Sequence, residues 1–213
     1  STSGSSYVVF GTGNAFAASV NLSTLDGTNG FRLDGEAAND LSGRSVSSAG
    51  DVNGDGYDDL IIGADAADIN GNSSGSSYVV FGTGNAFAST VNLSTLNGTN
   101  GFRLDGAAAG DYSGFSVSSA GDVNGDGYDD LIIGAYGADI NGNSSGSSYV
   151  VFGTGNAFAA TVNLSTLDGT NGFRLDGVAT DDKSGFSVSS AGDINGDGYD
   201  DLIIGAIYAD PNG

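Results

Sequence analysis

The 213-residue chain contains no cysteine, histidine, methionine or tryptophan, and only one proline. Without cysteine, no disulfide can hold the fold together. Without histidine or cysteine, the common nucleophilic triads and most transition-metal sites are excluded. The sequence also has neither an apolar run long enough for a membrane-spanning helix nor a signal-peptide pattern. We therefore expect neither an enzyme nor insertion into a membrane.

Basic residues are also scarce. Five Lys and Arg residues stand against 26 Asp and Glu residues, which gives a formal net charge of −21. So acidic a surface repels the phosphates of nucleic acids and the headgroups of anionic membranes, so we expect neither as a partner.

What the chain has in abundance is repetition. The segments 1–71, 72–142 and 143–213 share the same residue at 57 of 71 positions. A nine-residue string begins at Asp51 and recurs 71 residues later at Asp122 and again at Asp193. The 38 glycines punctuate the sequence at intervals of about 8–12 residues, which is typical of all-β sandwiches and propellers.

Each string supplies oxygen donors in a pattern that suits a hard cation. Side-chain oxygens stand at positions 1, 3, 5 and 9, the backbone carbonyl of position 7 adds another, and a glycine at position 6 permits a sharp turn. Calcium takes about six to eight oxygen ligands and tolerates irregular geometry. We therefore expect three structural Ca²⁺ ions per chain. The predicted ligands are Asp51, Asn53, Asp55, Tyr57 and Asp59; Asp122, Asn124, Asp126, Tyr128 and Asp130; and Asp193, Asn195, Asp197, Tyr199 and Asp201. Position 8, which is Asp58, Asp129 and Asp200, is expected to point away from the metal into solvent or a second layer of contacts.

An EF-hand loop begins in the same way, but it needs an acidic residue at position 12 and a helix after it. Position 12 is isoleucine in every unit, within an apolar run that predicts a buried strand. The segment 113–135, with residues 146–153, resembles the FG-GAP repeat of integrin α-subunit β-propellers, particularly its bacterial versions. One difference is that the Gly-Ala-Pro of the family reads Gly-Ala-Asp, Gly-Ala-Tyr and Gly-Ala-Ile here. The resemblance implies calcium loops at one end of a propeller and ligand recognition at the other.

The unit predicts four antiparallel strands, named A to D. In the second and third units they cover residues 115–120 (A), 131–135 (B), 148–152 (C) and 173–175 (D). The metal loop joins A to B. The C–D stretch 11–30 holds an extra element around Val20, Leu22 and Leu25 that the sequence does not place. In such a sheet the A–B and C–D connections lie at one end, called the A–B end below, and the B–C and D–A connections lie at the other, the D–A end.

The order of these strands along the chain predicts self-association. The sequence begins with C and D and ends with A and B, so it carries a half-blade at each terminus. Because propellers have about four to eight blades, three cannot close a ring alone, and a half-blade exposes an unpaired edge. We expect a homodimer in which the half-blades of two chains meet and complete six blades. The alternative is that the chain is an excerpt of a longer single-chain propeller.

The differences among the units point to a working surface. Eight of the 14 variable positions lie in or beside the D–A and B–C connections. Because loops on a rigid scaffold usually carry binding, we expect a non-enzymatic module for adhesion or protein recognition, extracellular or at the cell surface. One alternative is a lectin-like module with clefts rimmed by Tyr112, Tyr136 and Tyr208. Another is a designed or recently amplified self-assembling scaffold without a natural ligand. Asp40, Asp111 and Asp182 in the D–A connections are interpreted as solvated loop charges or as part of a recognition face.

Overall fold

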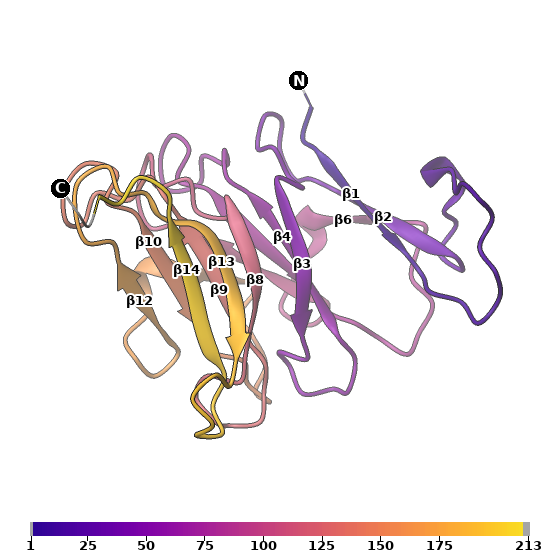
Figure 1. The fold of residues 1–213 in the computed structure, drawn as a ribbon. Helices are drawn as coiled ribbons and strands as arrows, with labels where there is room; N and C mark the ends of the chain where they lie inside the picture. The colour runs from indigo at the N-terminus through magenta and orange to yellow at the C-terminus, as the bar shows by residue number, and fades with distance from the viewer. Residues whose placement is uncertain (1, 211–213) are drawn as a thin grey trace.

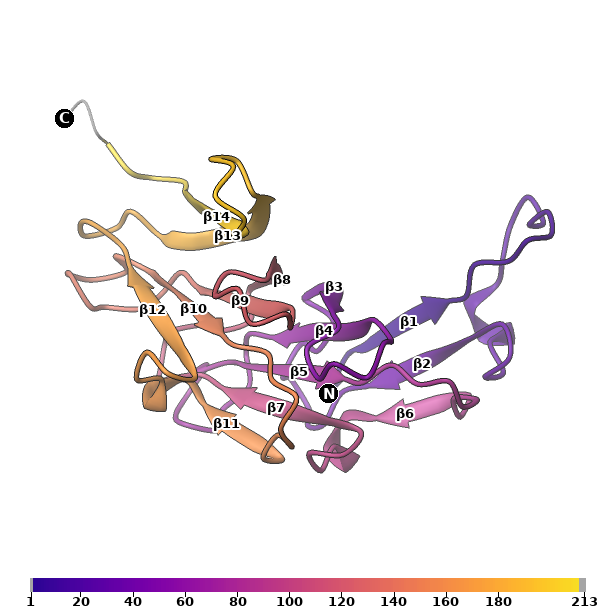
Figure 2. The same ribbon diagram turned by 90° about the horizontal axis from the view of Figure 1, so that it is seen from below.

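Sheets stand side by side in a curved row in the computed structural model, which describes residues 2–210 (Figures 1 and 2). Two complete blades form the middle of the row. Blade 1 comprises β3 (Ser45–Gly50), β4 (Asp59–Ala64), β5 (Ser76–Val80) and β7 (Gly101–Asp105). Blade 2 comprises β8 (Ser116–Gly121), β9 (Asp130–Ala135), β10 (Ser147–Val151) and β12 (Gly172–Asp176). These are the expected strands A to D, antiparallel throughout, so the all-β prediction with four antiparallel strands per blade is confirmed.

A pair of strands lies at each end of the row. The N-terminal half-blade is β1 (Ser5–Val9) with β2 (Gly30–Asp34), and the C-terminal half-blade is β13 (Ser184–Gly192) with β14 (Asp201–Ala206). Figure 2 shows the two half-blades at opposite ends of the arc. Within residues 2–210 no sheet joins them, so the row is open.

The B and C strands owe their stability to burial on both faces. Their Leu-Ile-Ile and Tyr-Val-Val runs combine high β-propensity with apolar surface, so they need no alternation with polar residues. In blade 2 every residue of β9 and β10 is buried. The register brings Ile62 opposite Tyr78 and Ile133 opposite Tyr149, which repeats the same cross-strand pair in both blades.

The C–D connections contain the element that the sequence did not place. Each has a single 3₁₀ turn, at Leu22–Thr24, Leu93–Thr95 and Leu164–Thr166. Before two of these turns lie the short strands β6 (Thr90–Asn92) and β11 (Thr161–Asn163). β6 pairs in parallel with β2, and β11 pairs in parallel with β7, so each connection adds an outer strand to the preceding sheet.

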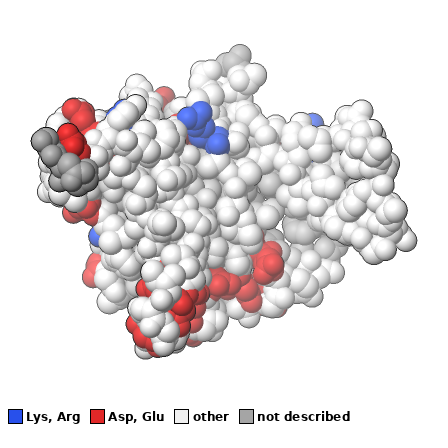
Figure 3. Space-filling model, viewed as in Figure 1, with Lys and Arg blue, Asp and Glu red and all other residues white. Residues whose placement is uncertain are grey.

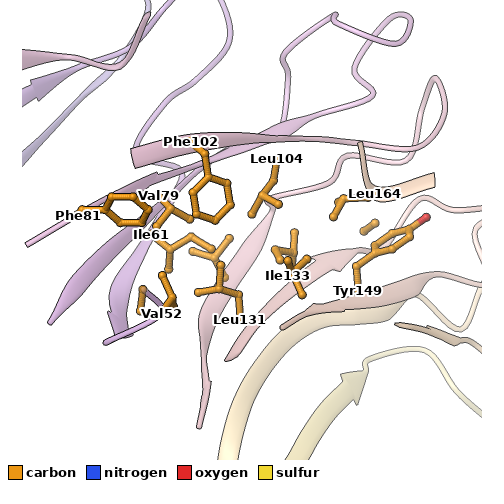
Figure 4. Close-up of a cluster of buried hydrophobic side chains, with 14 residues drawn as sticks. Val52, Ile61, Val79, Phe81, Phe102, Leu104, Leu131, Ile133, Tyr149 and Leu164 are labelled. Carbon is orange, nitrogen blue, oxygen red and sulfur yellow. The ribbon is translucent and has the colours of Figure 1, made fainter. Parts of the chain in front are cut away.

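The main core lies between blades and not within one (Figure 4). Ile61 of blade 1 faces Leu131 of blade 2, and Leu164 from the third 3₁₀ turn closes the same cluster. Burying such side chains contributes about 1.5–3 kcal/mol each. The blades therefore stabilise one another and fix the spacing of the loops at both ends.

Candidate metal centres

The three A–B loops fold around their own acidic side chains. In the first loop the two carboxylate oxygens of Asp51 accept hydrogen bonds from the amides of Asp55 (3.0 Å) and Gly56 (2.8 Å). The Asn53 side chain accepts from the Asp55 amide at 2.9 Å, and Asp55 accepts from the Tyr57 amide at 3.0 Å. The sequence folds this way because Gly56 takes a φ of 88°, a conformation that L side chains rarely adopt. The side chains at positions 1, 3 and 5 thus line one turn.

Position 9 lies deeper than the others. Asp59 is fully buried and accepts hydrogen bonds from the amides of Gly82 (2.8 Å) and Val52 (3.1 Å). Burial raises the pKa of Asp59 to about 7; the two amide hydrogen bonds oppose the shift, and the nearby Asp55 and Asp51 add to it. Asp130 has the equivalent partners, and burial raises its pKa to about 7 as well.

The loops suit a hard cation by their chemistry. All donors are oxygens, the acidic residues of one loop lie close enough to perturb each other, and no soft ligand is near. Within residues 2–210, no group of three acidic side chains is arranged so that it could hold a metal ion. The individual ligand assignments stay predictions.

Neighbouring A–B loops are bonded to each other, which the sequence did not predict. Asp129 at position 8 accepts a hydrogen bond from the Asp51 amide at 2.8 Å, and Asp200 accepts one from the Asp122 amide at 2.9 Å. Gly50 has no room for a side chain because the Asp129 carboxylate lies against it. Asp129 and Asp200 therefore connect successive loops instead of facing solvent, and the Gly-Asp pair at the start of each loop was the available sequence signal.

The D–A end carries an aromatic cluster that also holds two basic side chains. Tyr112 and Tyr136 stack with ring centroids 5.2 Å apart, and Phe115 meets Tyr136 edge-on at 4.6 Å. The Arg44 guanidinium lies 4.4 Å from the Phe115 centroid, and Lys183 Nζ lies 5.0 Å from that of Tyr208. Two of the three tyrosines expected to rim sugar-binding clefts thus cover each other, while Tyr208 is 62% exposed.

The backbone is unusual at the same end. Leu41, Tyr112 and Lys183, which are equivalent residues of the three D–A connections, all have φ between 54° and 59°. Non-glycine residues with positive φ carry a conformational cost and often mark functional loops. The strained positions coincide with the positions at which the three units differ.

Three equivalent acidic residues of the D–A connections are not solvated charges. Asp40, Asp111 and Asp182 are all buried. The carboxylates of Asp111 and Asp182 accept hydrogen bonds from the amides of Ala108 (3.0 Å) and Ala179 (2.9 Å), so they close their own loops. The interpretation as solvated loop charges is wrong for these residues, because they act as local hydrogen-bond acceptors.

One side chain in this region links two sheets. Glu36 accepts a hydrogen bond from the Tyr78 hydroxyl at 3.0 Å and forms an ion pair with Arg103 at 3.0 Å. The next unit has Ala107 in place of Glu36, and the buried Tyr149 hydroxyl has no hydrogen-bond partner within the described residues. The buried tyrosine hydroxyl therefore has a hydrogen-bond partner in blade 1 but, among residues 2–210, not in blade 2.

Charge is distributed unevenly between the two ends. Figure 3 shows acidic side chains gathered along the lower edge, where the A–B loops lie, and basic side chains only as isolated spots elsewhere. Within residues 2–210, no helix is long and apolar enough to cross a membrane.

Comparison with known proteins agrees with this arrangement of repeats. The FG-GAP repeat model matches residues 42–80, 113–151 and 184–213, more than half of the chain. Integrin alpha-PS2 of Drosophila melanogaster is 30% identical over 171 residues, which is 79% of this chain and 12% of that protein. Integrin alpha-IIb of Mus musculus is 32% identical over 184 residues, 84% of this chain and 16% of that protein. The chain thus spans less than a fifth of the length of these relatives. With three matched repeats on the blades described above, it belongs to the FG-GAP repeat family.

Proposed function

We propose that this chain is a calcium-binding, integrin-like propeller module that recognises a protein ligand at its D–A end and catalyses no reaction. The observation that carries the proposal is that the two ends differ in how much their sequences vary among the units. The A–B loops are nearly identical in all three units, whereas the D–A and B–C connections hold most of the differences. Identical loops suit a shared structural task, and variable loops on a rigid scaffold suit recognition.

Calcium has a structural role in this proposal. Its positive charge would offset the repulsion among Asp51 and Asp55 of the turn, the buried Asp59, and their equivalents. The residues that would hold it already present their oxygens from a tight loop between two core strands. Because loops of this acidity suit the millimolar calcium found outside cells, we place the protein in the extracellular space or at the cell surface.

The D–A end suggests the chemistry of the ligand. Arg44 and Lys183 are two of only five basic residues in the chain, and both lie against aromatic rings. A cation beside an exposed aromatic side chain suits an acidic residue that is flanked by an apolar one. We therefore favour an acidic peptide segment of a protein ligand.

Calcium titration tests the structural half of the proposal. Isothermal titration calorimetry of the calcium-free chain should give three ions per chain, and Asp126→Ala should reduce this number to two. Asp26→Asn is the matched control, since asparagine already stands at the equivalent position 97, and it should leave three. An unchanged stoichiometry in Asp126→Ala would contradict the assignment of that loop.

Binding arrays test the recognition half. Acidic peptides should bind the calcium-loaded chain, and Lys183→Glu should weaken them by about tenfold, or ~1.4 kcal/mol. Asn85→Ala at the A–B end is the control and should change nothing. Glycan binding that is lost in Tyr208→Ala but kept in Lys183→Glu would instead favour the lectin-like alternative. Failure to bind either class would favour a scaffold without a ligand.

A further inference from the structure

The N-terminal end of the arc presents an open strand edge and a groove. In both complete blades the C strand pairs on one side with strand B and on the other with strand D. β1 is also a C strand, but among the described residues 2–210 it pairs only with β2. Beside its free edge lies a groove of about 640 Å³ whose lining includes Tyr7, Val9, Val46 and Ile62. This groove lies where the A and B strands of a blade belong.

The C-terminal end presents the missing strands. β13 and β14 are strands A and B, and within residues 2–210 their only ladder is with each other, beside one isolated bridge between Ser184 and Gly146. Ile203 of β14 is 60% exposed, whereas its equivalents Ile61 and Ile132 are fully buried in complete blades. At Ile203, β14 therefore exposes apolar surface that β4 and β9 bury.

A stacked pair of phenylalanines occurs twice inside the chain, but the third, equivalent pair is not formed because its two members lie at opposite ends. The ring of Phe87 stacks on Phe31 at 4.3 Å, and the ring of Phe158 stacks on Phe102 at 4.3 Å. Each pair joins a C–D connection to the preceding sheet, next to the parallel strands β6 and β11. The equivalent pair would be Phe16 with Phe173, but Phe16 is 56% exposed at the opposite end of the arc.

The neighbouring leucines show the same pattern. Leu93 and Leu164, in the second and third 3₁₀ turns, are buried in the cores of the preceding sheets. Leu22, their equivalent in the first turn, is 42% exposed. β12 correspondingly has no parallel outer strand within the described residues.

The third metal loop also lacks contacts that the other two have. Asp51 and Asp122 each donate their amide to an aspartate of the next blade, Asp129 and Asp200. For the Asp193 amide the equivalent acceptor is Asp58, in the A–B loop of blade 1 beside the N-terminal half-blade. Asp201 accepts a hydrogen bond from the Ile194 amide. Its equivalents Asp59 and Asp130 also accept a second one, from the amides of Gly82 and Gly153. The glycine equivalent to these two for Asp201 is Gly11. Gly11 belongs to the N-terminal half-blade and Asp58 to the blade next to it.

We propose that the C-terminal edge of one chain docks on the N-terminal edge of a second copy, so that β13 and β14 fill the groove beside β1 and the second copy completes the third metal loop. The junction repeats the contacts between β4 and β5, with Ile204 opposite Tyr7 of the second copy. Such head-to-tail contacts form a ring if the rotation closes. Two chains give six blades, within the usual range of about four to eight, whereas three chains exceed it.

Native mass spectrometry and sedimentation in calcium test the assembly. The assembly should have about twice the mass of one chain, which is 20.9 kDa. Phe16→Asp and Ile203→Asp damage opposite edges, so each variant alone should be monomeric. Ile140→Asp is the control, because this exposed side chain lies in a B–C connection away from both edges, and it should remain dimeric.

Mixing the two edge variants tests the head-to-tail geometry. The Phe16→Asp chain keeps an intact C-terminal edge and the Ile203→Asp chain an intact N-terminal edge, so the mixture should form a dimer through one junction. A dimer in which like edges meet would be disrupted by only one of the two variants, and mixing would not bring the disrupted chain back into a dimer. A monomeric wild-type chain in calcium, or edge variants that keep the dimer mass, would overturn the proposal.

Disulfide trapping checks the register of the junction. The sequence has no cysteine, so Tyr7→Cys with Ile204→Cys introduces the only pair. Directly opposed residues of antiparallel strands have Cβ atoms about 4.5–5.5 Å apart. Mild oxidation should therefore give a covalent dimer on a non-reducing gel. Tyr7→Cys with Ile203→Cys, one residue out of register and on the opposite strand face, should give little; equal yields would contradict the predicted pairing.

Discussion

At the scale of single residues, two tyrosines with the same position in the fold have different surroundings. Tyr78 and Tyr149 are both fully buried on their C strands. The Tyr78 hydroxyl donates a hydrogen bond to Glu36, and the Tyr149 hydroxyl has no partner among the described residues. Burial raises the pKa of Tyr149 to about 12, so its hydroxyl stays protonated at neutral pH. Tyr149 lacks this hydrogen bond because Ala107 stands in its unit where Glu36 stands in the preceding one.

Removing each hydroxyl should therefore have a different effect on stability. Tyr78→Phe should lower the free energy of unfolding by about 1 kcal/mol, because it breaks a buried hydrogen bond to a charged acceptor. Tyr149→Phe should be neutral or slightly stabilising, because it removes a buried polar group without a partner. Urea unfolding at fixed calcium measures both. Equal losses in the two variants would show that Tyr149 has a partner of comparable strength.

The inverse change offers a control for this comparison. Ala107→Glu places a carboxylate where Glu36 stands in the preceding junction, close to Tyr149 and Arg174. It should stabilise the chain by up to about 1 kcal/mol, because it satisfies the buried hydroxyl. The gain should disappear in the double variant that also carries Tyr149→Phe.

The sequence could not predict this difference between the junctions. The Glu36–Tyr78 hydrogen bond joins residues 42 positions apart, one in the D–A connection after β2 and one in β5. Comparison of the units shows that position 36 varies, but not what it contacts. The ion pairs of the strand D arginines are easier to predict, because each partner lies two residues further along the same strand. The pairs are Arg32–Asp34, Arg103–Asp105 and Arg174–Asp176.

At the scale of elements, the A–B hairpins form a connected series. Asp129 accepts a hydrogen bond from the Asp51 amide, and its own amide donates to the Asp51 carbonyl oxygen at 3.3 Å. Asp200 and Asp122 repeat this pair of bonds. Each loop is thus held by the blade that follows it, and not by its own blade alone.

Truncation of Asp129 should weaken this connection. Asp129→Ala should cost about 1–2 kcal/mol of stability, because the Asp51 amide loses a charged acceptor. Asp58→Ala is the matched variant, and it is made in the Phe16→Asp background, which prevents a second copy from binding. There it should change the free energy of unfolding by only a few tenths of a kcal/mol. Thermal unfolding without calcium compares the two. A similar loss in both would mean that the Asp129 contact contributes little.

The sequence predicted elements well where their signals are local. Strands A to D follow from apolar runs and the turn chemistry between them, and each complete blade has them in the expected order. β6 and β11 were not predicted, because they are three residues long and pair with a strand of the preceding unit. The bonds between metal loops were missed for the same reason, since Asp51 and Asp129 are 78 residues apart.

At the scale of the whole molecule, the repeat predicts the architecture but not the surface chemistry. A 71-residue period with one metal string per period is enough to predict identical blades in a row. It does not reveal that Tyr112 and Tyr136 stack on each other at the D–A end. Those side chains come from a D–A and a B–C connection, and their contact depends on how the two loops fold. Side chains that differ among units are the ones that the repeat cannot predict.

The offset between the 71-residue unit and the blade has a consequence for how such a protein can change over time. Each unit begins just before strand C of one sheet and ends in the B–C connection of the next, so every unit carries one edge of each kind. Duplication or loss of a unit in the gene therefore adds or removes one blade and needs no new surface, because the junction created is the same as those already present. A lineage built in this way can change the number of blades in whole steps while every intermediate keeps complementary ends.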